Sequence, residues 1–307
     1  MNCSKELINN KVGVVVLNYK AFNETIQCVD SILLQKGVVP HIIIVDNNSL
    51  NESIGELKKR YDIDNRVEII ESGENLGFAR GNNLGICELV SQGYEYIFLA
   101  NSDLLFSSDN IIADMISCYQ KSEDTVGIIN PLVLNPDKSQ ATFIYFKKKY
   151  MRLRMIKTFV EAFFKRMKEF LGCRKDKLVK DNDILDLNNI NVASNNKTTS
   201  FLVHRDYFKI VGCAYMYTPE FFRYYNQMYP KTFLYGEEYC TALYLDAAGL
   251  CTMEVDTDAI IHLGGRSTSS NVKRSKYVRK TYNKAVLELI FTKRPEILSK
   301  YGRKDDQ

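Results

Sequence analysis

The sequence predicts an α/β fold with a mainly parallel central sheet and helices on both faces. Two observations carry this prediction. Short runs rich in Val and Ile alternate with stretches of helical period over the first 135 residues, which is the pattern of repeated strand–helix–strand units. The runs are apolar throughout, as expected of strands buried on both faces of a parallel sheet. With 307 residues and 45% hydrophobic content, the chain can bury one large core or two small ones.

The elements follow from these patterns in chain order. Strands are expected where β-branched or aromatic runs are continuous, at residues 12–19, 41–48, 66–72 and 94–101. Helices are expected where apolar residues recur at helical spacing, at residues 23–35, 53–61, 78–93, 143–172, 230–250 and 273–291. Residues 198–212 indicate a strand and then a short helix, and residues 251–265 indicate a final strand that opens into a glycine pair.

Positive charge is concentrated in one aromatic, helix-forming segment. Residues 147–180 carry a net charge of +10, whereas the whole chain carries +4. No recognisable nucleic-acid module accompanies this charge, so nucleic acid is not expected as a partner. A basic amphipathic helix on an anionic membrane surface fits better. The alternative is a helix whose apolar side packs on the core while its lysines are solvated.

Several classes are excluded by motifs that the sequence lacks. It has no GxGxxG after the first strand, no GxxxxGK[ST] and no GxSxG, which argues against a dinucleotide fold, a P-loop enzyme and an α/β-hydrolase. No run approaches the ~18 apolar residues of a membrane span, and the N-terminus does not resemble a signal peptide. The eight cysteines form no CxxC pair. These features predict a cytoplasmic protein with reduced cysteines.

Polar side chains follow three of the predicted strands. They are Asn18 and Tyr19 after the first, residues 46–48 after the second and residues 101–103 after the fourth. Each group alone is compatible with ordinary turn chemistry. Because ligands of parallel sheets bind beyond the carboxyl ends of the strands, three groups at one edge predict a single polar crevice.

Six segments in order resemble the family 2 inverting glycosyltransferases: VVVLNYKAFNE, IIIVDNNS, ENLGFARGNNLGI, YIFLANSD, FLYGEEY and IIHLGG. Within that family they resemble the rhamnosyltransferase-like branch, which acts on bacterial polysaccharides. The resemblance spans residues 12–270. It implies a GT-A fold with a nucleotide-sugar-binding α/β half at residues 1–135 and an acceptor-binding, catalytic half of the same domain at residues 201–307. Between them, residues 136–200 form the basic aromatic segment, a candidate for membrane or acceptor contact.

The resemblance implies a UDP- or dTDP-sugar donor and a divalent cation, Mn²⁺ or Mg²⁺. Asn101, Ser102 and Asp103 occupy the position of the family's DxD-type motif, with Asp103 as the cation ligand. Such a cation stabilises the charge of the leaving diphosphate and prefers carboxylate oxygens. Because Asn101 and Ser102 replace two potential carboxylates, phosphates and water must complete the coordination. His262 matches the family's strand-borne histidine near the metal or diphosphate. The alternative for Asp103 is a helix cap.

The remaining donor contacts are carried over by position. Asp46 resembles the family's contact to N3–H of uracil or thymine, for which a carboxylate is a good acceptor. Tyr19 is placed to stack on the base. The other candidates around the nucleotide are Leu17, Asn18, Asn47, Asn75, Gly77, Arg80, Asn83, Asn101, Ser102, Arg266 and Ser267.

Glu237 and Glu238 match the family's "ED" motif. The resemblance implies that the second residue, Glu238, is the general base that removes the proton from the acceptor hydroxyl. Glu237 is the alternative base. A purely structural explanation also exists for both residues, because acidic side chains interact favourably with a helix N-terminus. Residues 213–229 depart from the family pattern and are expected to shape the acceptor site.

The expected function is inverting transfer of a sugar to a glycan or a polyprenyl-diphosphate-linked acceptor in capsule, O-antigen or exopolysaccharide synthesis. The protein is then cytoplasmic or peripheral on the inner face of the membrane. Two alternatives stay open, a nucleotidyltransferase and a non-catalytic nucleotide-sugar-binding protein. A nucleotidyltransferase would need a Gly- and Arg-rich loop after the first strand, and the segment LNYKAFNE is not such a loop. A non-catalytic binding protein is compatible with the sequence because the NSD and GEE segments differ from the family's motifs. The oligomeric state is not predicted.

Overall fold

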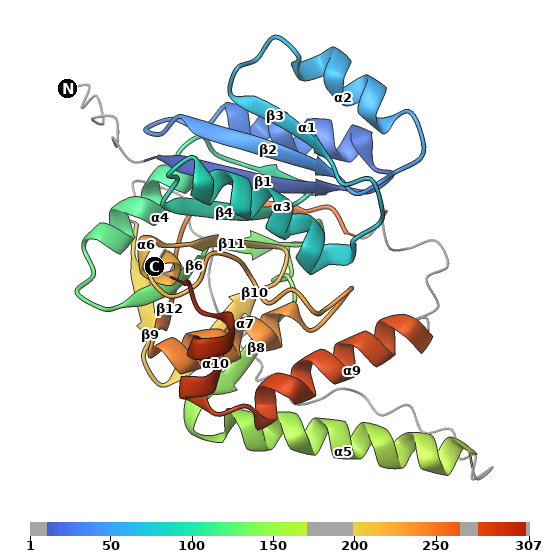
Figure 1. Cartoon of the computed structure of the whole chain (residues 1–307). Helices are drawn as coiled ribbons and strands as arrows, with labels where there is room; N and C mark the ends of the chain where they lie inside the picture. The colour runs from blue at the N-terminus through green and yellow to red at the C-terminus, as the bar shows by residue number, and fades with distance from the viewer. Residues whose placement is uncertain (1–10, 171–198, 265–275, 305–307) are drawn as a thin grey trace.

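The computed structural model describes residues 11–170, 199–264 and 276–304. Its centre is a large sheet with the strand order β3-β2-β1-β4-β11-β6-β12-β9 (Figure 1). In chain order these strands are β1 (Val12–Asn18), β2 (Pro40–Asp46), β3 (Val67–Glu71), β4 (Tyr96–Asn101), β6 (Val126–Asn130), β9 (Phe201–His204), β11 (Ala214–Tyr217) and β12 (Cys251–Val255). Only β11 and β9 run against the others. The predicted α/β class with a mainly parallel sheet is confirmed.

Helices cover both faces of this sheet, as expected. One face packs against α1 (Phe22–Leu33), α2 (Ser53–Tyr61) and α4 (Ile111–Gln120). The other packs against α3 (Gly77–Ser91), α6 (Pro219–Phe222) and α7 (Glu237–Ala248). Farther from the sheet, α9 (Lys276–Phe291) and α10 (Arg294–Tyr301) pack on α7, and α5 (Met151–Phe170) packs on α9 (Figure 1). Along β1, Val14 and Val16 enter the first core and Val15 enters the second. Full burial of such a side chain stabilises by about 1.5–3 kcal/mol, so the apolar run favours a central strand.

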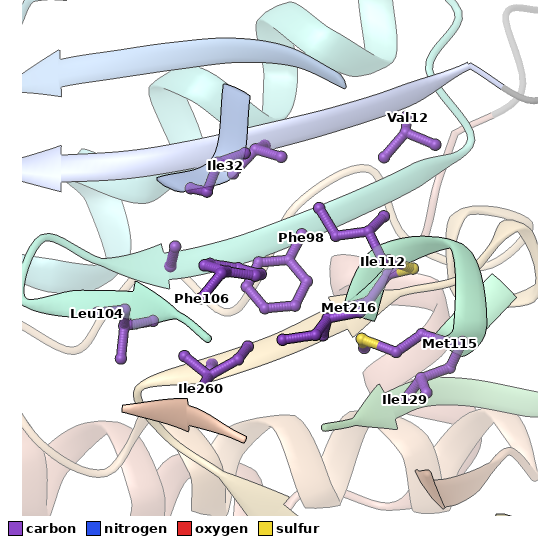
Figure 2. Close-up of a cluster of buried hydrophobic side chains, with 14 of the residues drawn as sticks. Val12, Ile32, Phe98, Leu104, Phe106, Ile112, Met115, Ile129, Met216 and Ile260 are labelled. Carbon is purple, nitrogen blue, oxygen red and sulfur yellow. The ribbon is translucent and has the colours of Figure 1, made fainter. Parts of the chain in front are cut away.

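Two smaller sheets complete the fold. One has the order β5-β13-β7, with β5 (Leu104–Phe106), β7 (Val133–Leu134) and β13 (Ile260–His262); the other pairs β8 (Phe143–Lys147) with β10 (Tyr207–Val211). A 3₁₀ turn (Lys148–Tyr150) joins β8 to α5. Figure 2 shows Phe98 of β4 and Leu104 and Phe106 of β5 within one apolar cluster. The turn between β4 and β5 is therefore anchored on both sides by buried side chains.

The predicted strands and helices of residues 12–101 are confirmed, with ends shifted by a few residues. Three predictions further on were wrong. Residues 143–147 are a strand, not helix, because this aromatic and β-branched run finds an antiparallel partner in β10. That same pairing replaces the short helix expected within residues 198–212. Residues 251–265 contain two strands, β12 and β13, in different sheets.

The helix expected at residues 230–250 begins only at Glu237. Tyr235 and Gly236 have φ of +70° and +90°, two consecutive left-handed residues that no α-helix can contain. The helix ends at Ala248, and the residue after it, Gly249, is also left-handed, as is common for a glycine after the last turn. Because a helix cannot extend through Tyr235 and Gly236, α7 begins directly after them, and both glutamates lie in its first turn.

The cysteines within the described part of the chain are free thiols. All but Cys87 are buried.

Candidate functional site

The polar residues after β1, β2 and β4 lie side by side, as the sequence predicted. In the parallel register Asn18 lies opposite Asp46, and Leu17 lies opposite Asn101. These positions form the carboxyl edge of the sheet, where ligands of parallel sheets bind.

Asp46 is held by neutral donors at this edge. The Asn18 side-chain amide donates to Oδ1 of Asp46 at 2.6 Å, and the Ser49 backbone N–H donates to Oδ2 at 3.0 Å. The Ser49 hydroxyl donates to Oδ1 as well, and the Thr25 hydroxyl donates to Oδ1 of Asn18 at 2.8 Å. All four residues are buried. A carboxylate offers about four acceptor positions, so Asp46 is fixed in place while keeping capacity for a further donor.

Asn47 fastens the end of β2 to the start of α3. Its amide donates to Oδ1 of Asn75 and to the backbone oxygen of Gly77, both at 3.2 Å, and its Oδ1 accepts the Leu76 N–H at 2.9 Å. Gly77 has φ of +77°, and a Cβ there would lie 2.2 Å from the backbone oxygen of Phe233. Only glycine fits this contact, which joins the loop at residues 75–77 to the segment that leads into α7.

The other donor candidates differ in what they contact. Both polar atoms of the Asn83 side chain bond the backbone of Met228, at 2.9 and 3.0 Å, so this buried amide holds the chain after α6 against α3. Arg80 is exposed and lies 3.4 Å from Glu74. Tyr19 is half-buried, and Leu17 packs against α3. Arg266 and Ser267 lie outside the described residues.

Asp103 and His262 come together although they are far apart in sequence. Strands β5 and β13 pair antiparallel, with His262 opposite Leu104, and the Leu263 N–H donates to the backbone oxygen of Asp103 at 2.9 Å. Nε2 of His262 lies 3.4 Å from Oδ2 of Asp103. Ser102, beside them in the turn, is buried.

A carboxylate and an imidazole at this separation are donors that Mn²⁺ accepts. No group of three or more His, Cys, Asp or Glu side chains suited to a metal occurs in the part of the chain that the structure describes. Phosphate oxygens and water would therefore have to supply the remaining ligands, as is usual for Mg²⁺ bound together with a phosphorylated substrate. The residues present thus fit a cation that binds with its substrate.

The two glutamates at the start of α7 differ in exposure. Glu237 is buried, and within the described residues its Oε1 accepts no hydrogen bond. Burial, and then the charge of Glu238, raise the pKa of Glu237 above its ordinary value of 4.5. Glu238 is only partly covered, although burial of its carboxyl group raises its pKa too. The pair therefore keeps a proton to higher pH than two ordinary carboxylates would.

The Gly212–Cys213 turn lies between the two acidic groups. The Cys213 backbone oxygen accepts the Asn101 N–H at 3.0 Å, which places the turn against the end of β4. Burial raises the pKa of the Cys213 thiol to about 12, and the charges of both Asp103 and Glu238 add to that shift. The structure therefore brings the candidate cation ligand and the candidate base to one turn. Sequence reasoning missed Gly212, Cys213, and the roles of Thr25 and Ser49.

Three comparisons bear on this site. A family model described as Glycosyl transferase family 2 matches residues 13–175. Glycosyltransferase GlyG of Streptococcus pneumoniae serotype 4 is 32% identical over 136 residues, which are 44% of this chain and 43% of that protein. The matched part is less than half the length of the curated relatives.

Two solved structures share most of the architecture. S. aureus TarS 1–349 in complex with UDP-GlcNAc has a TM-score of 0.54 at 8% identity and covers 92% of this chain and 67% of its own. GalNAc-T7 with UDP, GalNAc and Mn²⁺ has a TM-score of 0.56 at 14% identity and covers 90% of this chain and 48% of its own. At these identities the likeness shows a shared fold alone. Among the described residues, no helix is long and apolar enough to cross a membrane.

Proposed function

The chain belongs to glycosyl transferase family 2 and has the GT-A fold, and we propose that it transfers a sugar, with inversion, from a nucleoside diphosphate donor to a glycan or polyprenyl-diphosphate-linked acceptor. One observation carries the proposal. Asp103, which lies beside His262, and Glu238, which follows Glu237, both lie near the Gly212–Cys213 turn. Holding a diphosphate through a cation and deprotonating an acceptor hydroxyl are the two tasks of such a transfer.

The proposed sugar transfer is a single displacement at the anomeric carbon of the donor. Glu238 accepts the proton of the acceptor hydroxyl while the hydroxyl oxygen bonds to the anomeric carbon of the donor sugar. The bond from that carbon to the diphosphate oxygen breaks, and the nucleoside diphosphate leaves with the electron pair. Attack opposite the leaving group inverts the anomeric centre. Asp103 and His262 would hold a divalent cation, which, when bound, stabilises the charge of the diphosphate.

The remaining roles concern the donor base and the pathway. Asp46, fixed by Asn18 and Ser49, accepts N3–H of uracil or thymine, and Tyr19 stacks on the ring. The TarS structure is a complex with UDP-GlcNAc and the GalNAc-T7 structure one with UDP, GalNAc and Mn²⁺, which supports a uridine nucleotide and Mn²⁺ as first probes. The rhamnosyltransferase-like branch and a place in bacterial surface polysaccharide synthesis rest on the sequence resemblance.

The test is a binding and turnover screen. We expect UDP or dTDP together with Mn²⁺ to raise the melting temperature, since a ligand at about 100 times its Kd stabilises by ~2.7 kcal/mol. EDTA should abolish the rise, and a matching nucleotide sugar should release nucleoside diphosphate. Binding without any turnover or hydrolysis would favour a non-catalytic sugar-nucleotide-binding protein. Release of pyrophosphate from a nucleoside triphosphate would favour a nucleotidyltransferase instead.

We further propose that α5 contacts an anionic lipid surface. Its inner side is structural: Met151 and Met155 are buried, and Arg152 donates to the backbone oxygens of Ile290 and Thr292 at 2.6 and 2.7 Å. Its outer side keeps apolar groups exposed beside basic ones. Among the α5 side chains that the structure describes, the exposed apolar ones are Leu153, Val160, Phe164 and Met167. Apolar groups next to exposed cations match an anionic membrane better than a neutral protein surface.

Replacing Lys149, Arg154 and Lys157 by glutamine should release the protein from anionic vesicles. All three side chains are exposed, and each basic group near such a surface contributes about 1 kcal/mol, so binding should weaken by roughly two orders of magnitude. Co-sedimentation at low salt with vesicles of anionic phospholipid measures this. The matched control replaces Lys59, Lys121 and Lys138, which are exposed elsewhere. A wild-type protein that stays in the supernatant would exclude membrane contact.

A further inference from the structure

Gly212 lies directly beneath the carboxylate of Glu238. A Cβ built on Gly212 would be 2.0 Å from Oε1, 2.9 Å from Cδ and 3.1 Å from Cγ of Glu238. Carbon and oxygen atoms without a bond between them do not approach to 2.0 Å, so a side chain at position 212 and the observed carboxylate exclude each other. The carboxylate occupies the volume that a side chain would take.

The backbone at this position does not itself require glycine. Gly212 does not have a positive φ, whereas Gly77, Gly236 and Gly249 do. An alanine would therefore adopt the same backbone without strain of the left-handed kind. What distinguishes glycine here is the absence of a side chain, and the group that uses the free space is Glu238.

The turn that carries Gly212 is held on both sides. The Val211 N–H donates to Oδ1 of the buried Asn130 at 3.0 Å, and Val211 pairs with Phe143 of β8. Beyond the turn, Ala214 pairs with Ala100 of β4. The turn cannot retreat without breaking these contacts. The Glu238 carboxylate is the end of a flexible side chain, so a new Cβ would displace the carboxylate and leave the turn in place.

We propose that Gly212 is a positioning residue: by leaving its side-chain volume empty, it sets where the Glu238 carboxylate lies relative to the acceptor. The inference rests on the proposed function, in which Glu238 is the base. It also accounts for a glutamate where the family pattern has an aspartate, because the longer side chain reaches over the turn only when residue 212 has no Cβ. Gly212 touches neither substrate nor cation in this account.

Gly212→Ala should fold normally and turn over slowly. Relief of the clash moves Oε1 by about 1 Å or more, and a displacement of that size costs on the order of 10²-fold in rate. We expect kcat to fall by about 10–100-fold, the KM for the donor to stay unchanged and the melting temperature to shift little. Gly55→Ala is the matched control. Gly55 lies on the exposed side of α2 with nothing within 4 Å of its built Cβ, and its replacement should leave kcat unchanged.

A double-mutant cycle separates positioning from a general packing effect. Glu238→Asp withdraws the carboxylate by one methylene, so in that background the 2.0 Å contact with Oε1 is gone, and the position of Cγ, 3.1 Å from the built Cβ, needs only a small adjustment. The alanine should then lower kcat by less than 3-fold, although it costs about 10–100-fold beside the natural glutamate. Equal losses in the two backgrounds would overturn the proposal, and so would full activity of Gly212→Ala with Glu238 intact.

A readout that does not need turnover keeps the proposal testable by itself. The ¹³C chemical shift of the Glu238 carboxyl group should change in Gly212→Ala and not in Gly55→Ala. An unchanged shift would overturn the positioning role. If the wild-type protein transfers no sugar while Gly212→Ala still moves this signal, the proposed function fails and the steric dependence of Glu238 on Gly212 stands.

Discussion

Glu238→Gln should lower kcat by about 10²–10⁴-fold, the usual contribution of a positioned general base. Glutamine keeps the size and shape of the side chain but cannot take the proton of the acceptor hydroxyl. Donor affinity should change little, because the base acts on the acceptor and not on the diphosphate. Steady-state rates with saturating donor, together with donor binding by calorimetry, measure both quantities. A loss confined to kcat is the mark of an interaction made mainly in the transition state.

The neighbouring glutamate supplies the control. Glu237→Gln should cost less, since Glu237 is buried and Glu238 is the more exposed of the two. Wild-type turnover should also fall with decreasing pH at a value above the ordinary 4.5, because the pKa of each glutamate is raised and the base must be ionised. A severe loss in Glu237→Gln with a mild one in Glu238→Gln would exchange the two roles, and two mild effects would remove both residues from the chemistry.

Asp103→Asn should abolish the Mn²⁺-dependent part of donor binding. Replacing even an outer-sphere partner of a metal typically costs 10–100-fold in affinity, so loss of the only carboxylate in the proposed cation site should cost at least ~10²-fold. Asparagine has nearly the same volume, and the backbone bond from Leu263 N–H to the Asp103 oxygen does not depend on the side chain. The fold should therefore persist, as circular dichroism and thermal melting can check.

The measurement is the Kd for UDP or dTDP with Mn²⁺ and with EDTA, in the variant and in a control. Asp62→Asn, on an exposed residue after α2, should bind as the wild type does. The expected result is that the variant with Mn²⁺ binds no better than the wild type with EDTA. Metal-dependent affinity that survives the substitution would show that the cation, if bound, is held elsewhere.

The donor side of the fold was predictable because its signals are local. A β-branched run ending in a polar residue indicates both a buried strand and a group at the sheet edge, and Asn18, Asp46 and Asn101 lie there as neighbours. The resemblance implied that His262 lies near the cation or the diphosphate, and in the structure the pairing of β13 with β5 brings it beside Asp103. Their roles in binding stay predictions.

The second half was less predictable because its structure depends on long-range partners. Residues 143–147 have a sequence compatible with helix and become a strand only because β10 pairs with them. Residues 213–229 contain β11, which completes the sheet between β4 and β6, although the local pattern gives no sign of it. The contact of Gly212 with Glu238 joins two segments through space, and no periodicity or motif in one sequence reports such a contact.

The place of β11 has a consequence for how the protein is made. As the chain leaves the ribosome, β6 is complete before either of its sheet neighbours exists, since both β11 and β12 are synthesised later. Until β11 is made, one edge of β4 has no partner strand, and until β12 is also made, neither edge of β6 is fully paired. Both β4 and β6 are almost entirely apolar. Open apolar edges are templates for pairing with other chains. These strand edges therefore stay unpaired until β11 has been synthesised, and we expect a fragment ending at residue 135, which lacks β11 and β12, to aggregate.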